Sequence, residues 1–276
     1  MPSTSTTIST SETFDYSDAD VIIRSNAPNQ VDFKVHKLIL RLSSPFFESM
    51  FTLPKSPLQQ TSVDDSLPIV DMSESSTILD KLFRMVYPIP DPVFNNLDAL
   101  TPIVQAAHKF DMQAVLGSLR RVIVTPAFLD KEPMRVYAIA ATYDFGEEAK
   151  IASRYTLRLN LLDYPLSIEM KSMSGYYYHQ LLQMHRTRGK AAKQIIDSAK
   201  LSCRYSCHSS FWTGWKSDAA VELSERPVGD VVFSQEFMYR NERSTCERAS
   251  AGSQYCNRVN VLIDLKKAID SLPDTI

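Results

Sequence analysis

Glycine is scarce in this sequence, and the few glycines are scattered. Seven glycines occur among 276 residues, and they nowhere form the cluster that a phosphate-binding or dinucleotide-binding turn requires. The G-x-S-x-G pattern of serine hydrolases and the H-E-x-x-H pattern of zinc proteases are also absent. These absences argue against catalysis, and we predict a protein that is not an enzyme.

Long apolar runs and a surplus of one charge are lacking as well. The sequence has no run of about 18 apolar residues that would predict a membrane span, and residues 1–17 lack the charged start and apolar core of a secretory signal. Thirty Lys and Arg against 32 Asp and Glu give a net charge of -2, without the basic field of a dedicated nucleic-acid binder. We therefore expect an intracellular protein, cytoplasmic or nuclear, whose partners are proteins.

Cysteine is absent from the first 200 residues, and all four cysteines follow after that point. Cys203, Cys207, the adjacent His208, Cys246 and Cys256 offer enough ligands for one tetrahedral zinc ion. The nine residues between the last two cysteines exceed the usual spacing of a zinc-binding pair. Two interpretations stay open: a zinc site, or reduced thiols that pack like other small side chains.

The hydrophobic pattern of the first half predicts a mixed α+β domain over residues 20–125. Residues 1–19 are rich in Ser and Thr and poor in large apolar groups, which is typical of a disordered tail. Residues 21–24 and 31–35 are rich in β-branched side chains around a turn-forming segment, and residues 67–72 repeat the pattern. We expect a short three-stranded sheet flanked by helices.

Helices are predicted where apolar residues recur at a spacing of three and four. Apolar residues recur at helical spacing from His36 to Phe51, and Ser44 and Pro45 suit the cap and first position of a helix, so two short helices are expected there. The other apolar helical stripes of this half lie between residues 78 and 86, 97 and 110, and 115 and 122.

These elements and their sequence words resemble the BTB/POZ domain, in the form found in fungal-type proteins without kelch repeats or DNA-binding zinc fingers. The words that carry the resemblance are Asp20-Val21, Phe33-Lys34-Val35-His36-Lys37-Leu38-Ile39-Leu40, Ser43-Ser44-Pro45-Phe46-Phe47, Leu82-Phe83-Arg84-Met85-Val86-Tyr87-Pro88 and Ala106-Ala107-His108-Lys109-Phe110. The resemblance implies the BTB/POZ fold and a role in binding other proteins.

The resemblance also assigns roles to individual residues. His36 is expected at the corner between sheet and helices, as a buried histidine bonded to backbone, with Phe46 and Phe47 as structural residues of the helix that follows. Asp20 and Lys37 match the positions that supply a charged pocket at the family's dimer interface. Lys37 stands where Arg is common, which removes the two-pronged pairing that a guanidinium offers.

The resemblance implies dimerisation, and in some members recruitment of cullin-type ubiquitin ligases. The loop from Leu53 to Ser66 has no Glu and carries prolines where ligase adaptors place a hydrophobic residue and a Glu, which argues against recruitment. We predict a self-associating interaction protein that presents its C-terminal region to partners. The alternatives are a zinc-binding regulatory protein that contacts nucleic acid and a ligase substrate adaptor.

Beyond the first domain, a helical extension is predicted over residues 126–200 and a Cys- and Trp-containing segment over residues 201–276. Residues 174–199 have the pattern of one long helix, which Gly189 would weaken. Four basic residues on it are expected to form a solvated face, where contact with nucleic acid is the less favoured reading: Arg186, Arg188, Lys190 and Lys193.

Overall fold

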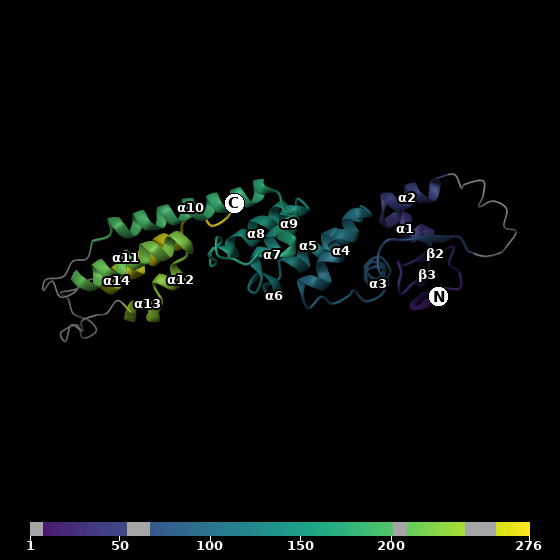
Figure 1. Cartoon of the computed structure of the whole chain (residues 1–276), viewed down its shortest axis with the longest axis horizontal. Helices are drawn as coiled ribbons and strands as arrows, with labels where there is room; N and C mark the ends of the chain where they lie inside the picture. The colour runs from purple at the N-terminus through teal and green to yellow at the C-terminus, as the bar shows by residue number, and fades with distance from the viewer. Residues whose placement is uncertain (1–7, 54–66, 201–208, 241–257) are drawn as a thin grey trace, which may run out of the picture. The chain divides into compact units, whose positions relative to one another are not determined.

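A computed structural model describes residues 8–53, 67–200, 209–240 and 258–276 (Figure 1). The chain divides into two compact units, the first ending at Thr125 and the second beginning at Pro126. No helix in the described parts of the chain is long and apolar enough to cross a membrane.

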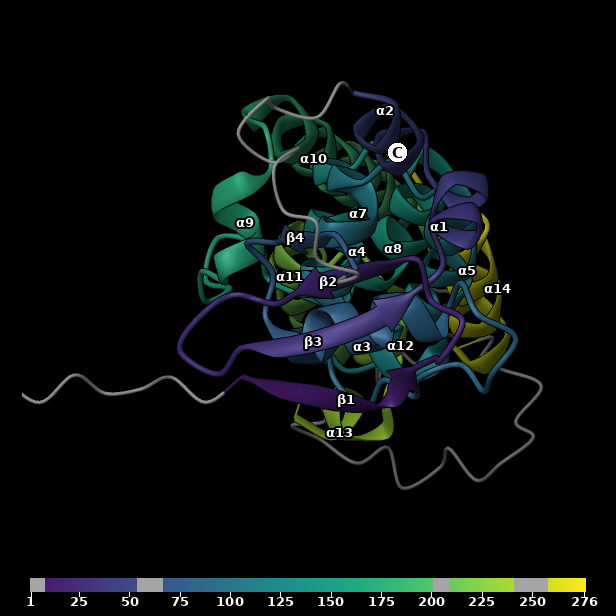
Figure 2. The ribbon, with the colours of Figure 1, turned by 90° about the vertical axis from the view of Figure 1, so that its right-hand side faces the viewer.

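The first unit contains a four-stranded sheet with the order β1-β3-β2-β4 (Figure 2). Its strands are β1 Ser9–Asp15, β2 Val21–Arg24, β3 Val31–Val35 and β4 Ile69–Asp71. The hairpin of β2 and β3 is antiparallel, with Ile23 opposite Phe33, whereas β1 runs parallel to β3 and β4 runs parallel to β2. Alternate residues of β2 and β3 are buried, as the period of a strand requires.

The expectation of a disordered tail over residues 1–19 is wrong for residues 9–15. These residues form β1, and they add a fourth strand to the three that were predicted. Phe14 anchors the strand: its side chain is fully buried, and its ring lies 5.7 Å from Phe83 and 5.4 Å from Tyr87. One aromatic side chain in a polar segment is a weak sequence signal, but it buries enough apolar area to hold the strand.

Helices complete the first unit: α1 Lys37–Ser43, α2 Pro45–Thr52, α3 Ser76–Arg84, α4 Leu97–Lys109 and α5 Gln113–Ile123. The predicted cap between the first two is confirmed, because the Ser44 hydroxyl accepts a hydrogen bond from the Phe47 amide at 3.1 Å. The same hydroxyl donates to the Phe110 carbonyl at 2.5 Å. One serine therefore begins α2 and ties it to the end of α4.

Helices are the only regular secondary structure in the described parts of the second unit. Its helices are α6 Pro126–Leu129, α7 Pro133–Thr142, α8 Gly146–Thr156, α9 Ile168–Ser172, α10 Gly175–Ser198, α11 Ser209–Glu225, α12 Gly229–Val232, α13 Gln235–Arg240 and α14 Arg258–Asp270. Arg135 of α7 forms two hydrogen bonds with Glu169 of α9, at 2.6 and 3.0 Å. Burial raises the pKa of Glu169, but the hydrogen bonds that the carboxylate accepts, first among them those from Arg135, together with the charge of Arg135 lower the pKa overall.

Helix α10 packs along α11 and α14 (Figure 1), and the three share one core around Trp215. The indole of Trp215 is fully buried and donates to the Val232 carbonyl at 3.0 Å. Gly189 does not break α10. Its missing side chain lets α11 cross close by, since a Cβ on Gly189 would lie 2.7 Å from the Leu223 carbonyl oxygen. The boundary expected after residue 200 therefore does not separate two bodies.

Three residues of the basic run on α10, Arg186, Lys190 and Lys193, are exposed as expected of a solvated face, but Arg188 is buried. The Arg188 side chain donates to the backbone carbonyls of Pro227 at 2.8 Å, Ile269 at 2.9 Å and Pro273 at 2.9 Å, and to that of Leu272. These carbonyls follow α11 and end α14, where a cation is favoured by the helix dipole. Arg188 thus joins three segments of the second unit.

Candidate interaction surface

Asp20 and Lys37, the predicted charged pair, lie together at the start of α1. The Asp20 carboxylate accepts a hydrogen bond from the backbone amide of Lys37 at 2.7 Å. His36 occupies the cap position of α1 without a capping bond from its own side chain, and Asp20, the residue before β2, supplies a bond to the first turn instead. The contact places a carboxylate at the positive end of the helix dipole, where it is stabilising. The Lys37 backbone carries this contact.

An apolar face of α1 begins directly beside this contact. Leu38 and Leu42 lie one turn apart and are 62% and 80% exposed, whereas Leu40 between them is fully buried in the core. Residues four apart lie on the same side of a helix. We call Leu38 and Leu42 the α1 face. Large apolar side chains exposed at neighbouring positions of one helix are typical of a protein-binding surface.

His36 lies at the corner between β3 and α1, as predicted, but its side chain is partly exposed, at 23%, and its ring is bonded to side chains and not to backbone. Its Nδ1 lies 3.2 Å from the Tyr87 hydroxyl and its Nε2 lies 3.2 Å from the Asp18 carboxylate. The Tyr87 hydroxyl also accepts a hydrogen bond from the His36 amide at 2.8 Å. The histidine ring therefore fastens the corner to the residue that follows α3.

Aromatic rings pack around this corner. Tyr16 stacks on Tyr87 with ring centres 5.5 Å apart and an angle of 11° between the planes, and it contacts His36 at 5.1 Å. Burial raises the pKa of Tyr87 to about 12, so its hydroxyl keeps its proton. The hydrogen bond from His36 lowers the pKa of Asp18. This network was not predicted, since Tyr87 is 51 residues from His36 in the sequence.

Phe46 and Phe47, predicted as structural, differ in their surroundings. Phe47 is fully buried and its ring lies 5.3 Å from Phe110. The Phe46 ring lies 5.2 Å from the same phenylalanine, but the residue is 39% exposed. Phe47 therefore belongs to the core, whereas Phe46 closes one edge of it and reaches the surface at the start of α2.

The predicted zinc ligands lie outside the described residues: Cys203, Cys207, His208, Cys246 and Cys256. In the described parts of the chain, no three His, Cys, Asp or Glu side chains are grouped as metal ligands. The loop bearing on ligase recruitment, from Leu53 to Ser66, is also outside them except for its first residue.

The family model of the BTB/POZ domain matches residues 11–126. Its match begins inside β1 and spans the sheet, the corner and the helices through α5. No curated protein matches the chain.

The first unit is therefore a BTB/POZ domain, an α+β fold whose small sheet is flanked by helices. A BTB/POZ domain is a protein–protein interaction module, not a catalytic one. The BTB/POZ resemblance and the α+β fold class predicted from the sequence are confirmed, with four strands in place of three.

Proposed function

We propose that this chain is a non-catalytic protein-binding protein that self-associates through its BTB/POZ domain and presents residues 126–276 to other partners. The observation that carries the proposal is the α1 face. Leu38 and Leu42 project from an ordered helix of an interaction module and are left uncovered by the rest of the described chain. A second copy of the same face is the occupant that we infer.

Symmetry makes a small apolar face effective. In a twofold dimer each residue of the face is used twice, so two leucines per chain contribute four buried side chains. Full burial of a leucine is worth about 1.5 to 3 kcal/mol. The interface needs more area than these side chains provide, and the half-exposed Phe46 offers an apolar extension at the start of α2.

The Asp20 contact supports the same surface by fixing the helix that bears it. The Asp20 carboxylate is exposed, and its bond to the Lys37 amide holds the first turn of α1 in place. Loss of such a cap costs about 1 kcal/mol. We therefore infer that Asp20 positions the α1 face, in addition to any charge that it presents to the second copy.

Substitution of the α1 face tests the proposal. We expect the full chain to have twice its mass of 31.2 kDa by light scattering, and Leu42→Asp to give the single-chain mass because it buries a charge in the interface. The control is Val93→Asp, which changes a residue of the same unit that is equally exposed, at 80%, and leaves the mass doubled. Circular dichroism confirms that both variants fold.

A single-chain mass for the unchanged protein would contradict self-association. A doubled mass that survives both Leu42→Asp and Leu38→Asp would leave the dimer standing but would exclude the α1 face as its interface.

A further inference from the structure

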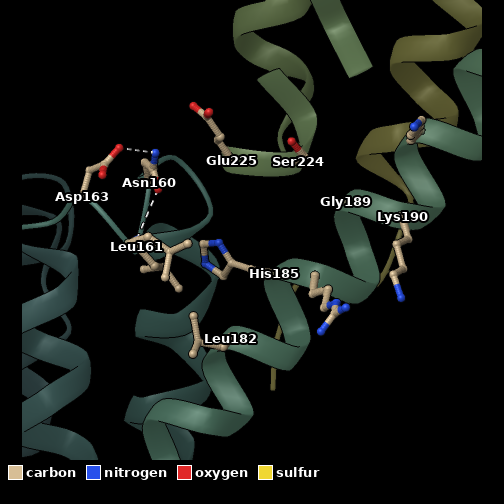
Figure 3. Close-up of a pocket in the computed structure, with 12 residues that line it drawn as sticks. Asn160, Leu161, Asp163, Leu182, His185, Gly189, Lys190, Ser224 and Glu225 are labelled. Carbon is tan, nitrogen blue, oxygen red and sulfur yellow. Dashed lines mark hydrogen bonds between the residues drawn. The ribbon is translucent and has the colours of Figure 1, made fainter. Parts of the chain in front are cut away.

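The second unit contains a cavity of about 630 Å³ that has no part in the proposed self-association. Three elements form its walls: the loop Asn160–Asp163 after α8, the middle of α10, and the end of α11 (Figure 3). The close crossing at Gly189 brings the end of α11 against α10 and so creates the third wall. The volume lies within the range of about 300 to 1,000 Å³ that is usual for binding pockets.

His185 offers a hydrogen-bond acceptor to this cavity. The Thr156 hydroxyl donates to the Ser153 carbonyl at 2.6 Å, so it accepts from Nε2 of His185 at 3.0 Å. The proton of the neutral ring is then on Nε2 and Nδ1 is an acceptor. Burial lowers the pKa of His185 to about 4, so the ring is neutral at pH 7. Among the described residues, no group bonds to Nδ1.

Leucines provide the apolar part of the cavity. Leu161 lies next to the His185 ring and Leu182 lies one turn earlier on α10 (Figure 3). Leu162, also in the lining, is 80% exposed at the rim. An apolar group that enters the cavity would therefore contact leucine on two walls, with a hydrogen-bond acceptor at its tip.

Three cations line the α10 side of the cavity. Arg186, Lys190 and Lys193 follow one another at spacings of four and three residues, which places them along one side of the helix over about 10 Å. All three are exposed, and none has an ion-pair partner within the described chain. Two carboxylates also line the cavity, and that of Asp163 is engaged by the Asn160 amide at 2.7 Å.

We propose that this cavity binds an acidic segment of a partner protein, with one tyrosine side chain inserted between Leu161 and Leu182 and its hydroxyl donating to His185. The charge of the segment complements the three unpaired cations. Tyrosine combines an apolar body with a donor at its tip, which is the combination that the lining requires.

A nucleic acid fits the lining less well. Binding of single strands relies on aromatic side chains against which bases stack, and no Phe, Tyr or Trp lines this cavity. The observations thus favour a peptide, and nucleic acid becomes an outcome of the test.

The test measures binding of defined peptides to the full chain by fluorescence anisotropy. The probe is a labelled twelve-residue peptide with a central Leu-Tyr pair flanked by four Glu residues. We expect it to bind at least about tenfold more tightly than the same peptide with Gln in place of Glu. Replacing its Tyr by Phe should weaken binding by about three- to tenfold, because His185 loses its donor.

Variants of the protein locate the site. Lys190→Glu with Lys193→Glu should weaken binding of the acidic peptide by at least about tenfold. The control pair, Lys171→Glu with Lys267→Glu, changes exposed lysines away from the cavity by the same total charge and should leave binding within about twofold.

Three results would overturn the proposal. One is a dissociation constant weaker than about 100 μM for the acidic peptide, and another is an equal loss of binding in both double variants. The third is tighter binding of a twelve-nucleotide oligouridine that is lost in Lys190→Glu with Lys193→Glu, which would make nucleic acid the ligand. The light-scattering mass is measured on the same samples, so failure of self-association is scored separately.

Discussion

The two units of this chain hold themselves together by different means. In the first unit, Phe14, Phe33, Phe83 and Tyr87 form an aromatic cluster between the sheet and α3, with ring centres 5.4 to 6.0 Å apart. In the second unit, an apolar core around Trp215 is joined by a buried cation, Arg188, whose side chain donates to four backbone carbonyls. The stability that apolar packing provides depends little on pH. A buried polar group, in contrast, destabilises the fold when one of its hydrogen-bond partners is lost.

Both tryptophans of the chain, Trp212 and Trp215, belong to the second unit. Tryptophan fluorescence therefore follows unfolding of that unit alone, whereas amide hydrogen exchange follows each unit separately. The stability of the two units can therefore be measured separately.

The first prediction concerns Phe14, which anchors β1 in the first unit. Phe14→Ala removes a fully buried ring and should lower the free energy of unfolding of that unit by about 3 to 5 kcal/mol. Amide exchange in α3 and β3 should accelerate accordingly, with exchange in α10 unchanged. Glu12→Ala, on an exposed position of the same strand, is the control and should change little. Equal exchange in Phe14→Ala and the unchanged chain would mean that β1 is dispensable.

The second prediction concerns Arg188, the polar counterpart in the second unit. Arg188→Met keeps the apolar stem but leaves buried carbonyls without donors, so we expect a loss of about 3 kcal/mol in the unfolding free energy of this unit. Urea unfolding followed by tryptophan fluorescence measures it. Arg186→Met, two residues earlier and exposed, should shift stability by less than about 0.5 kcal/mol. Similar effects of the two changes would refute the role of Arg188.

The third prediction is the response of the second unit to acid. His185 has a pKa of about 4 in the folded chain against an ordinary 6.5, because burial disfavours its charged form. Between these pH values the unfolded chain binds a proton that the folded chain does not, so stability falls as the pH falls. The loss at pH 4.5 relative to pH 7 should be about 2 kcal/mol from this group, by fluorescence-monitored urea unfolding.

His185→Gln isolates this effect, since glutamine keeps a donor for Thr156 and does not titrate. The variant should lose about 2 kcal/mol less stability between pH 7 and pH 4.5 than the unchanged chain. If both proteins lose the same amount, the acid response arises from other groups.

The fourth prediction compares one helical glycine in each unit. A Cβ on Gly189 meets the Leu223 carbonyl oxygen, so Gly189→Ala should destabilise the second unit by about 1 to 3 kcal/mol. A Cβ on Gly117, within α5, meets nothing within 4 Å, so Gly117→Ala should stabilise the first unit by about 0.5 to 1 kcal/mol. Thermal unfolding of the two variants gives the signs, and two effects of the same sign would contradict the helix crossing.

The first unit was predictable because its signals are local. The cap at Ser44, the alternation in β2 and β3 and the stripe of α4 each involve neighbours in sequence, and all were expected. β1 was not, because its pairing with β3 and the burial of Phe14 depend on residues about 20 or more positions away. The resemblance to the family predicted Asp20 and Lys37 as a pair, but it did not predict that the Asp20 carboxylate bonds to the backbone amide of Lys37.

The second unit was less predictable for the same physical reason. The sequence pattern of α10 predicted its bounds well, but nothing in it distinguished the buried Arg188 from the exposed Arg186 two positions earlier. The partners of Arg188 lie 39 to 85 residues away, and they are backbone carbonyls that carry no sequence signature. The cavity likewise depends on the crossing of α10 and α11 at Gly189, which the sequence presented as a weak point of the helix.

The central claim is that the BTB/POZ domain joins two copies of this chain, and its mass in solution tests that claim most directly. Multi-angle light scattering of the full chain should give about 62 kDa, twice 31.2 kDa, and Leu42→Asp should give the single-chain value. A mass of 31.2 kDa for the unchanged chain at a concentration of about 100 μM would contradict the account.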